Sequence, residues 1–272
     1  MTSTLRISYP HITRNALDVT PSAVYDEDYQ VANLITGRRS NYAQLATAAT
    51  TLTVDYDLGT GNTATCNHLI IGRADLLQAD VVDNIYLRGD DNAAFSSPEN
   101  VVSDTDWDGD ALTGPDTQDY IITFTASTAL RFWRVELSKD SGTTKFPCSN
   151  IYFGTFWDAL VSPADFEYKV ATANESTIEM SMGNIILTRT DLPRYVFNIT
   201  WEGVTDVLTT AFKDNLLKKS FDNYVYLYTT SAEILADNTL VYCRLIDEST
   251  SVTKTKIPNY NIINASFEQV IK

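Results

Sequence analysis

The feature that most constrains this chain is a strict alternation of apolar and polar residues. Thr51–Gly59 reads TLTVDYDLG, which puts Leu52, Val54 and Tyr56 on one side and acids or threonine on the other. Successive side chains of a strand point to opposite faces, so a repeat of two predicts a strand with one buried face. The same repeat recurs in RFWRVELS (131–138) and YVFNITW (195–201). A chain built from such segments folds into antiparallel sheets that each bury one face.

One segment has a different period. Between about 204 and 220, one set of residues follows the spacing of a helix face: Val204, Val207, Leu208, Ala211, Phe212 and Leu216. Tyrosine (15 residues) and phenylalanine (11) are plentiful while charged residues make up 20%, a balance that favours strands elsewhere. The predicted fold class is therefore mainly β: a jelly-roll β-sandwich followed by a second antiparallel β domain that carries one α-helix.

Charge and composition exclude several classes of function. The net charge of −15 repels phosphate backbones, so no nucleic-acid partner is expected. No apolar run reaches the ~20 residues of a membrane helix, so no membrane insertion is expected. Three cysteines far apart in the sequence predict reduced thiols in a protein made in the cytoplasm.

The 272 residues suggest two domains. A mixed, polar stretch separates two strand-rich blocks, and it predicts a first domain over 1–160, a linker over 161–174 and a second domain over 175–272. Further strands are expected near His68–Arg73, Asn84–Arg88, Tyr120–Phe124 and Asn150–Phe156.

Residues 20–157 resemble the galactose-binding-like, or discoidin-type, β-sandwich family. Four stretches carry the resemblance in order: YQVANLITGRRSNY, LTVDYDLGTGNTATCNHLIIGR, ALRFWRVELS and SNIYFGTFWD. The family implies a jelly roll of eight strands whose loops at one end hold sugars, lipids or protein ligands. This sequence departs from the family pattern at Thr36, where an aspartate is usual, and at Tyr42, where tryptophan is usual.

Residues 175–272 are similar to the β domains of bacteriophage tail-tube and distal tail proteins. The resemblance is carried by RYVFNITW, one helix, several strands and the ending NYNIINASFEQVI. It implies a ring-forming protein of the virion whose sheets pair or pack between subunits. An unrelated α+β domain is the alternative.

The acidic stretch SDTDWDGD spans Ser103–Asp110 and includes Asp104, Asp106, Trp107, Asp108 and Asp110. The aspartate spacing matches the first half of an EF-hand, but position 12 is proline rather than glutamate and no helix flanks the stretch. An EF-hand is therefore excluded. A calcium-binding β loop, a sugar-stacking site on the tryptophan, and a solvated acidic loop remain alternatives.

Arg38 and Arg39 form a tight basic pair in an acidic chain. They are predicted either to pair with nearby aspartates in a turn or to contact an acidic loop of a neighbouring subunit.

GTGNTA (59–64) fits a dinucleotide-binding pattern, but a strand is expected after it, so it is predicted to be a turn. His68 precedes an apolar strand and is predicted to be structural.

No catalytic motif and no metal or cofactor motif is found in the sequence, so no cofactor is expected. With the two resemblances, these observations predict a non-enzymatic structural protein of a bacteriophage virion, from the tail or its tip. Its partners would be like subunits in a ring, other virion proteins and host surface saccharide. A stand-alone carbohydrate-binding module is one alternative. A glycan hydrolase whose carboxylates are not local in sequence is the other.

Overall fold

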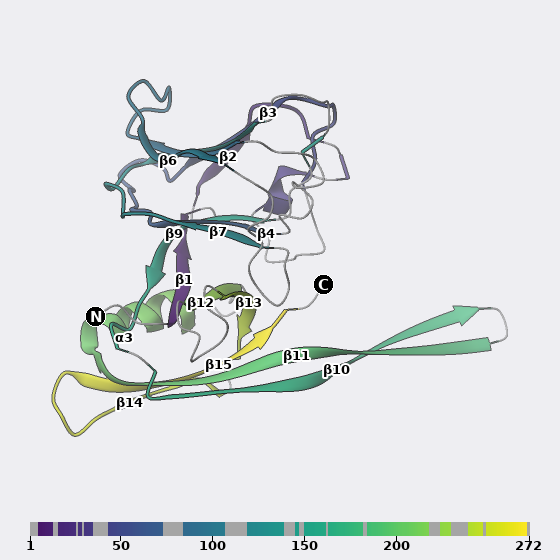
Figure 1. The fold of residues 1–272 in the computed structure, drawn as a ribbon, viewed down its shortest axis with the longest axis vertical. Helices are drawn as coiled ribbons and strands as arrows, with labels where there is room; N and C mark the ends of the chain where they lie inside the picture. Colours follow the sequence, from purple (N-terminus) through teal and green to yellow (C-terminus); the bar gives the residue numbers. More distant parts are fainter. Residues whose placement is uncertain are drawn as a thin grey trace. The chain divides into compact units, whose positions relative to one another are not determined.

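A computed structural model gives the fold of the chain (Figure 1). It describes residues 5–12, 16–25, 27–28, 30–34, 43–72, 84–106, 119–138, 145–146, 150–161, 163–181, 184–217, 224–229, 239–246 and 249–270. Nearly all regular structure in these ranges is antiparallel strand, and the one α-helix, α3 (Asp206–Phe212), lies where the helical period was expected. The predicted fold class is confirmed. No helix among the described residues is long and apolar enough to cross a membrane.

The chain divides into two compact units. The sandwich unit comprises residues 7–157 and 228–240, and the hairpin unit comprises residues 1–6, 158–227 and 241–272. Each unit is therefore made from stretches that are discontinuous in sequence. The predicted linker, 161–174, is wrong from residue 165 onward, because these residues begin strand β10 (Asp165–Ser181). A polar composition does not exclude a strand whose polar side chains face water.

Two antiparallel sheets stack in the sandwich unit, as Figure 1 shows. One sheet has the order β2-β3-β8-β5-β6. Its strands are β2 (Asp18–Pro21), β3 (Thr51–Asp57), β8 (Phe132–Ser138), β5 (Asn84–Asp90) and β6 (Glu99–Asp106). The other sheet places β1 (Leu5–His11), β9 (Asn150–Trp157), β4 (His68–Gly72) and β7 (Tyr120–Thr123) in that order. A short 3-10 turn, η1, covers Val31–Leu34.

The alternation seen in the sequence sets the inner face of each sheet. Val54 pairs with Val135 and Tyr56 with Trp133 across β3 and β8, and all four side chains are buried. From the opposite sheet, Phe153 meets the Tyr56 ring edge to face at 5.1 Å between centroids, and it lies 5.8 Å from the Trp133 ring. These three aromatic side chains form the centre of the sandwich core.

The hairpin unit is built on β15 (Tyr260–Gln269), which pairs along one edge with β11 (Asn184–Thr205). Its other edge pairs with β13 (Thr239–Leu245) at one end and with β14 (Ser251–Lys254) at the other. Strand β12 (Tyr224–Thr229) follows β13 in the sheet order.

Helix α3 covers part of this sheet and contacts both β11 and β15. Its first turn is capped by the Thr205 hydroxyl, which accepts from the Leu208 N–H at 3.5 Å. A π-helical turn, η2 (Lys213–Leu217), continues it. Phe212 and Leu216 are buried as the helical period predicted, together with Thr209. The prediction was wrong for Val207, which is 78% exposed, and for Val204, which belongs to β11 because the helix begins only at Asp206. The helical segment thus ends three residues before the predicted limit of 220 in the part of the chain that the structure describes.

The longest strands, β10 and β11, pair from Asp165↔Thr200 to Ser181↔Asn184. The pairing of β11 with β15 begins only at Val196, so beyond Val170↔Tyr195 the two strands continue as a two-stranded ribbon. Figure 1 shows this ribbon extending beyond the other strands of the unit. At about 3.3 Å per residue it is roughly 40 Å long.

Gly89 in β5 gives a test of the sandwich packing. A Cβ at this position would lie 2.5 Å from Leu130 Cδ1 and 3.2 Å from the Trp133 ring. We expect Gly89→Ala to lower the free energy of unfolding in urea by about 1–3 kcal/mol, the usual cost of overpacking. Leu130→Ala removes the clashing methyl group, so the double variant should lose less than the two single losses added together. Additive losses would show that the close approach of residue 89 to the Leu130 side chain is not the cause of the lost stability.

Candidate functional site

A pocket of about 570 Å³ opens at the end of the sandwich unit where β3 ends and β8 begins. This volume is within the range of small-molecule sites. Its lining residues come from the ends of β1, β3 and β9 and from two connecting turns: Ile12, Leu58, Asn62, Thr63, Ala64, Thr65, Ala129 and Thr155. Alkyl side chains and neutral hydroxyl and amide groups make up this lining, and none of these residues carries a charge.

The turn that forms one wall of the pocket requires glycine. Gly59 and Gly61 have φ angles of 85° and 82°, a left-handed conformation that is strained for other residues. Asn62 then closes the turn: its N–H donates to Gly59 O at 3.1 Å and its side-chain Nδ2 donates to Leu58 O at 3.0 Å. The wall is therefore fixed by short-range hydrogen bonds.

Asp57, the last residue of β3, holds the same turn to β8. Its Oδ1 accepts from the Gly59 N–H at 2.8 Å and from Arg131 Nε at 2.7 Å, and its Oδ2 accepts from Arg131 Nη2 at 2.9 Å. These hydrogen bonds from Arg131 lower the pKa of the Asp57 carboxyl, which stays ionised at neutral pH. On the far side, Ala64 and Leu130 exchange two backbone hydrogen bonds of 3.0 Å. The pocket is preorganised from both ends.

An apolar floor with a few neutral hydrogen-bonding groups suits a small, uncharged, hydroxyl-rich ligand. Leu58 and Ile12 are almost fully buried and provide the floor. Asn62, Thr63 and Thr65 are exposed and provide donors and acceptors at the rim. Such a site binds through hydrogen bonds and shape rather than through charge.

A serine, a histidine and an asparagine also lie in line near this end of β4. Ser8 Oγ is 2.6 Å from His68 Nε2, and His68 Nδ1 is 3.0 Å from Asn67 Oδ1. The amide oxygen can only accept, so Nδ1 carries the proton and Nε2 accepts from the serine. This is the order of groups in a nucleophilic triad. Ser8 and His68 are both 0% exposed, however, so no substrate reaches them.

The histidine is structural, as the sequence predicted. Burial lowers the pKa of His68 to about 3, and its ring stacks on Phe156 at 4.0 Å between centroids. Cys66 is buried as well, its Sγ lies 3.2 Å from His68 O, and burial raises the pKa of its thiol to about 12. A thiol in this state is not a nucleophile at neutral pH.

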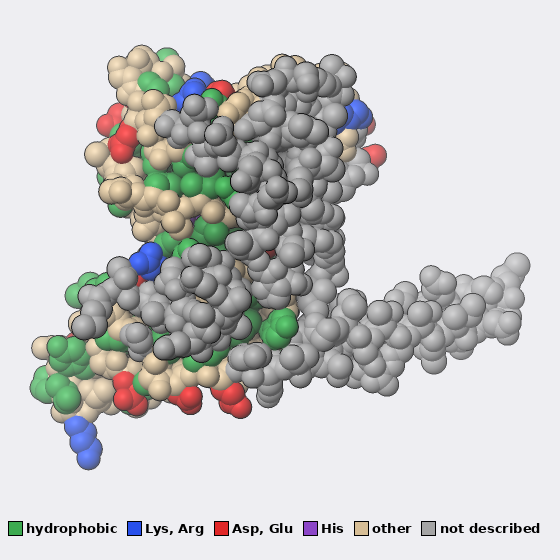
Figure 2. All heavy atoms as spheres, in the orientation of Figure 1, with side chains coloured by type: hydrophobic (Ala, Val, Ile, Leu, Met, Phe, Trp, Pro, Cys, Tyr) green, Lys and Arg blue, Asp and Glu red, His purple; other side chains and the backbone are tan. Residues whose placement is uncertain are grey.

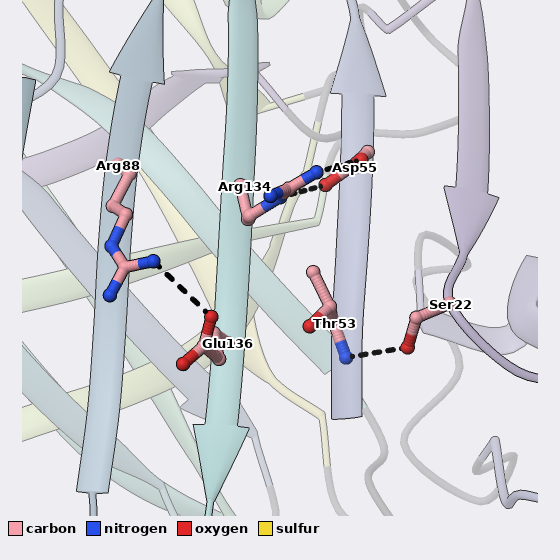
Figure 3. Close-up of polar contacts among 6 residues, drawn as sticks. All are labelled: Ser22, Thr53, Asp55, Arg88, Arg134 and Glu136. Atoms are coloured by element: carbon pink, nitrogen blue, oxygen red, sulfur yellow. Dashed lines mark hydrogen bonds and ion pairs between the residues drawn. The ribbon is translucent and has the colours of Figure 1, made fainter. Parts of the chain in front are cut away.

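A row of ion pairs crosses the outer face of the five-stranded sheet (Figure 3). Arg134 donates from Nε and Nη2 to the two oxygens of Asp55, at 2.6 and 2.7 Å, and Arg88 Nη1 lies 3.3 Å from Glu136 Oε2. The Arg134 guanidinium also lies 4.2 Å from the centre of the Phe95 ring. These partly exposed pairs balance one another, so they favour sheet pairing rather than a charged ligand.

The sequence predictions for the acidic stretch and the basic pair are largely untested. Asp104 and Asp106 belong to strand β6, so their placement in a loop was wrong. Trp107, Asp108 and Asp110 lie outside the described residues, as do Arg38 and Arg39. Within the described ranges, no group of three or more His, Cys, Asp or Glu side chains could hold a metal ion.

Comparison with known proteins places the chain in no family. No protein-family model matches it, and no curated protein matches its sequence. Among solved structures, it is similar to chitosan-binding module 1 of a Paenibacillus sp. IK-5 chitosanase/glucanase (14% identity, TM-score 0.41, 54% of this chain and 100% of the module).

Two further similarities cover the same share of this chain. The CBM62 module of Clostridium thermocellum Xyl5A matches at 14% identity and TM-score 0.40, over 54% of this chain and 99% of the module. A Ruminococcus gnavus GH29 fucosidase matches at 12% identity and TM-score 0.42, over 54% of this chain and 26% of the enzyme. At these values none of the three determines what the chain does.

The pocket was missed by sequence reasoning, although one signal pointed to it. GTGNTA was correctly predicted to be a turn, because strand β4 and not a helix follows it. Its two glycines and Asn62 are the residues that shape the pocket wall. What the sequence did not indicate was that Ile12 and Thr155, distant in the chain, lie across from this turn.

The buried histidine predicts a specific loss of stability in mild acid. The folded-state pKa of His68 is about 3 and its unfolded value is near 6.5, so the unfolded chain binds the extra proton as pH falls below 6.5. The part of the free energy of unfolding that depends on neutral His68 is present above pH 6.5. It is lost below this pH, by about 2 kcal/mol between pH 7 and pH 5.

Urea unfolding of the wild type and of His68→Gln over this pH range measures the effect. Glutamine does not titrate, so the variant should lack this part of the pH dependence, while the other titratable groups are the same in both proteins. Parallel pH profiles of the two proteins would show that His68 does not cause the loss of stability in mild acid.

Proposed function

We propose that the sandwich unit is a saccharide-binding module that acts without catalysis. The observation that carries this proposal is the uncharged, hydroxyl-lined pocket at the end of the sandwich. Saccharides are neutral and rich in hydroxyl groups, and their C–H faces pack on alkyl side chains such as those of Leu58 and Ile12. The rim threonines and Asn62 supply the matching donors and acceptors.

The proposed specificity is for neutral rather than acidic sugars. No lining residue of the pocket is cationic, and the chain carries a net charge of −15. A sugar carboxylate would lose its hydration in the pocket without gaining a partner. The solved structures that resemble this chain include complexes with fucose, with chitotriose and with an unsaturated mannuronic acid, and these sugars are suitable probes.

Binding without turnover follows from the same lining. Hydroxyl, amide and alkyl groups do not exchange protons near neutral pH, so the pocket offers neither a general acid nor a general base. The alternative of a glycan hydrolase needs a pair of carboxylates beside the sugar. Release of reducing ends from an oligosaccharide by the purified protein would favour the hydrolase.

A second candidate function, assembly into a bacteriophage virion, is favoured by the ribbon of β10 and β11. In the described part of the chain, β10 is the terminal strand of its sheet and the ribbon has no third strand. A two-stranded ribbon is marginal in water by itself, and an uncovered strand edge is a template for pairing with another chain.

In this candidate, the edge of β10 in one copy pairs with the free edge of β11 in the next. Repeated head-to-tail contacts of this kind close into a ring when the rotation allows it. The setting would be a phage tail or tail tip, in which the sandwich unit braces neighbouring virion proteins or binds host surface saccharide. The two candidates are compatible because they use different units.

The binding proposal is tested by titrating fucose and mannuronic acid into the protein by NMR or calorimetry. Fucose should bind more tightly than mannuronic acid. Thr63→Ala/Thr65→Ala should weaken fucose binding about tenfold, because each lost hydrogen bond costs about 0.5–1.5 kcal/mol. Thr60→Ala is the matched control, an exposed threonine of the same turn that does not line the pocket. If Thr60→Ala weakened fucose binding as much as the double change does, the pocket would not be the fucose-binding site.

The assembly candidate is tested by shortening the ribbon. Residues 172–193 are replaced by Asn-Gly, which joins the paired residues Ala171 and Arg194 through a two-residue turn. We expect rings of the full-length chain in electron micrographs, and a fall to the monomer mass for the shortened chain in light scattering. Fucose binding should not change. Rings that survive the shortening would eliminate the ribbon as the assembly element.

A further inference from the structure

The turn between β14 and β15 presents an exposed apolar side chain on a rigid support. Ile257 is 64% exposed at its tip. The Thr255 hydroxyl accepts from the Ile257 N–H at 3.2 Å and lies 2.9 and 3.0 Å from Ile257 O and Tyr260 O. Thr255 N–H also donates to Tyr260 O at 3.1 Å. The turn is already ordered, so it loses little further conformational entropy when it binds a partner.

Other exposed apolar groups lie next to this turn. Tyr260, at the start of β15, is 42% exposed. Val207, in the first turn of α3, is 78% exposed, and the preceding residue, Asp206, donates its N–H to Asn259 O at 3.2 Å. Large exposed side chains that gather in one place mark an interaction surface more often than scattered ones do.

The same turn is positively charged in an acidic protein. Lys254 and Lys256 are exposed, and the sequence from Ser249 to Phe267 contains no Asp or Glu. We name Lys254, Lys256, Ile257, Tyr260 and Val207 the knuckle. Figure 2 shows basic side chains projecting from this corner of the hairpin unit, with hydrophobic side chains beside them. One carboxylate, that of Asp206, is close by, and it accepts from Asn261 Nδ2 at 2.7 Å.

An acidic strip lies on the outer face of the same unit's sheet. Asp165 pairs with Thr200 and Glu167 with Asn198, and Glu202 follows Thr200 on the same face, opposite the buried Trp201. All three carboxylates are exposed, and among the described residues none of them forms an ion pair. In Figure 2, acidic side chains lie along the lower border of the hairpin unit.

We propose that the knuckle of one copy docks on the acidic strip of a second copy. The occupant is a second copy because the same unit carries both complementary charges, and because the chain as a whole, at −15, offers acidic surface to a basic tip. The apolar side chains supply the buried centre of the contact and the lysines its orientation. The contact is head-to-tail, since two different surfaces meet. It deepens the proposed assembly function and rests on it.

The test is a charge swap measured by sedimentation velocity on the full chain. Lys254→Glu/Lys256→Glu should weaken self-association at least tenfold, and so should raising NaCl from 50 to 500 mM. Adding Asp165→Lys/Glu167→Lys to the lysine reversal should restore the association. Ile257→Ser should also weaken it, and because this side chain is exposed, the melting temperature should not change.

The outcomes separate this inference from the assembly function. If the chain self-associates, and shortening the ribbon abolishes association while reversing the lysines does not, the knuckle contact is wrong and assembly stands. A chain that remains a 30.3 kDa monomer at every concentration overturns both. Recruitment of the wild type, but not of the lysine-reversed variant, to phosphatidylserine vesicles without self-association would replace the second copy by a membrane surface.

Discussion

The sandwich unit depends on one contact, the packing of Phe153 from one sheet against Tyr56 and Trp133 from the other. These side chains are large, and burying them is the main gain of bringing the two sheets together. The contact also fixes register, because a slip of one residue would turn Tyr56 and Trp133 to solvent. Gly89 is part of the same constraint, since it makes room for Leu130 beside the tryptophan.

The pocket follows from this register. Pairing of Asp57 with Phe132 places the carboxylate beside Arg131, which holds it with two short hydrogen bonds. The carboxylate in turn accepts from the Gly59 N–H and fixes the start of the glycine turn. Asp57 is thus a positioning residue: it lies outside the pocket lining, yet the wall of the pocket depends on it. The buried Ser8–His68 pair shows the opposite case, in which reactive groups serve the fold alone.

The two units present different kinds of surface. The sandwich unit balances its outward charges by cross-strand pairs such as Asp55–Arg134, and its neutral pocket is suited to a neutral ligand. The hairpin unit has exposed carboxylates, a basic turn and a ribbon to which no described residue adds a third strand. Binding and assembly are therefore assigned to separate parts of the chain, and each can be altered without the other.

The sequence by itself determined the strands, the helix near residue 206 and the turn at GTGNTA, because hydrophobic period and glycine chemistry act over a few neighbouring residues. It did not determine that β10 begins within the predicted linker, although Asp165–Val170 alternates polar and apolar residues, because this alternation is short and the rest of the strand is mostly polar. Nor did it locate the pocket, the knuckle or the acidic strip. These combine residues far apart in the chain, such as Ile12 with Thr63, or Glu167 with Glu202, and only the tertiary pairing of strands brings such residues to one surface.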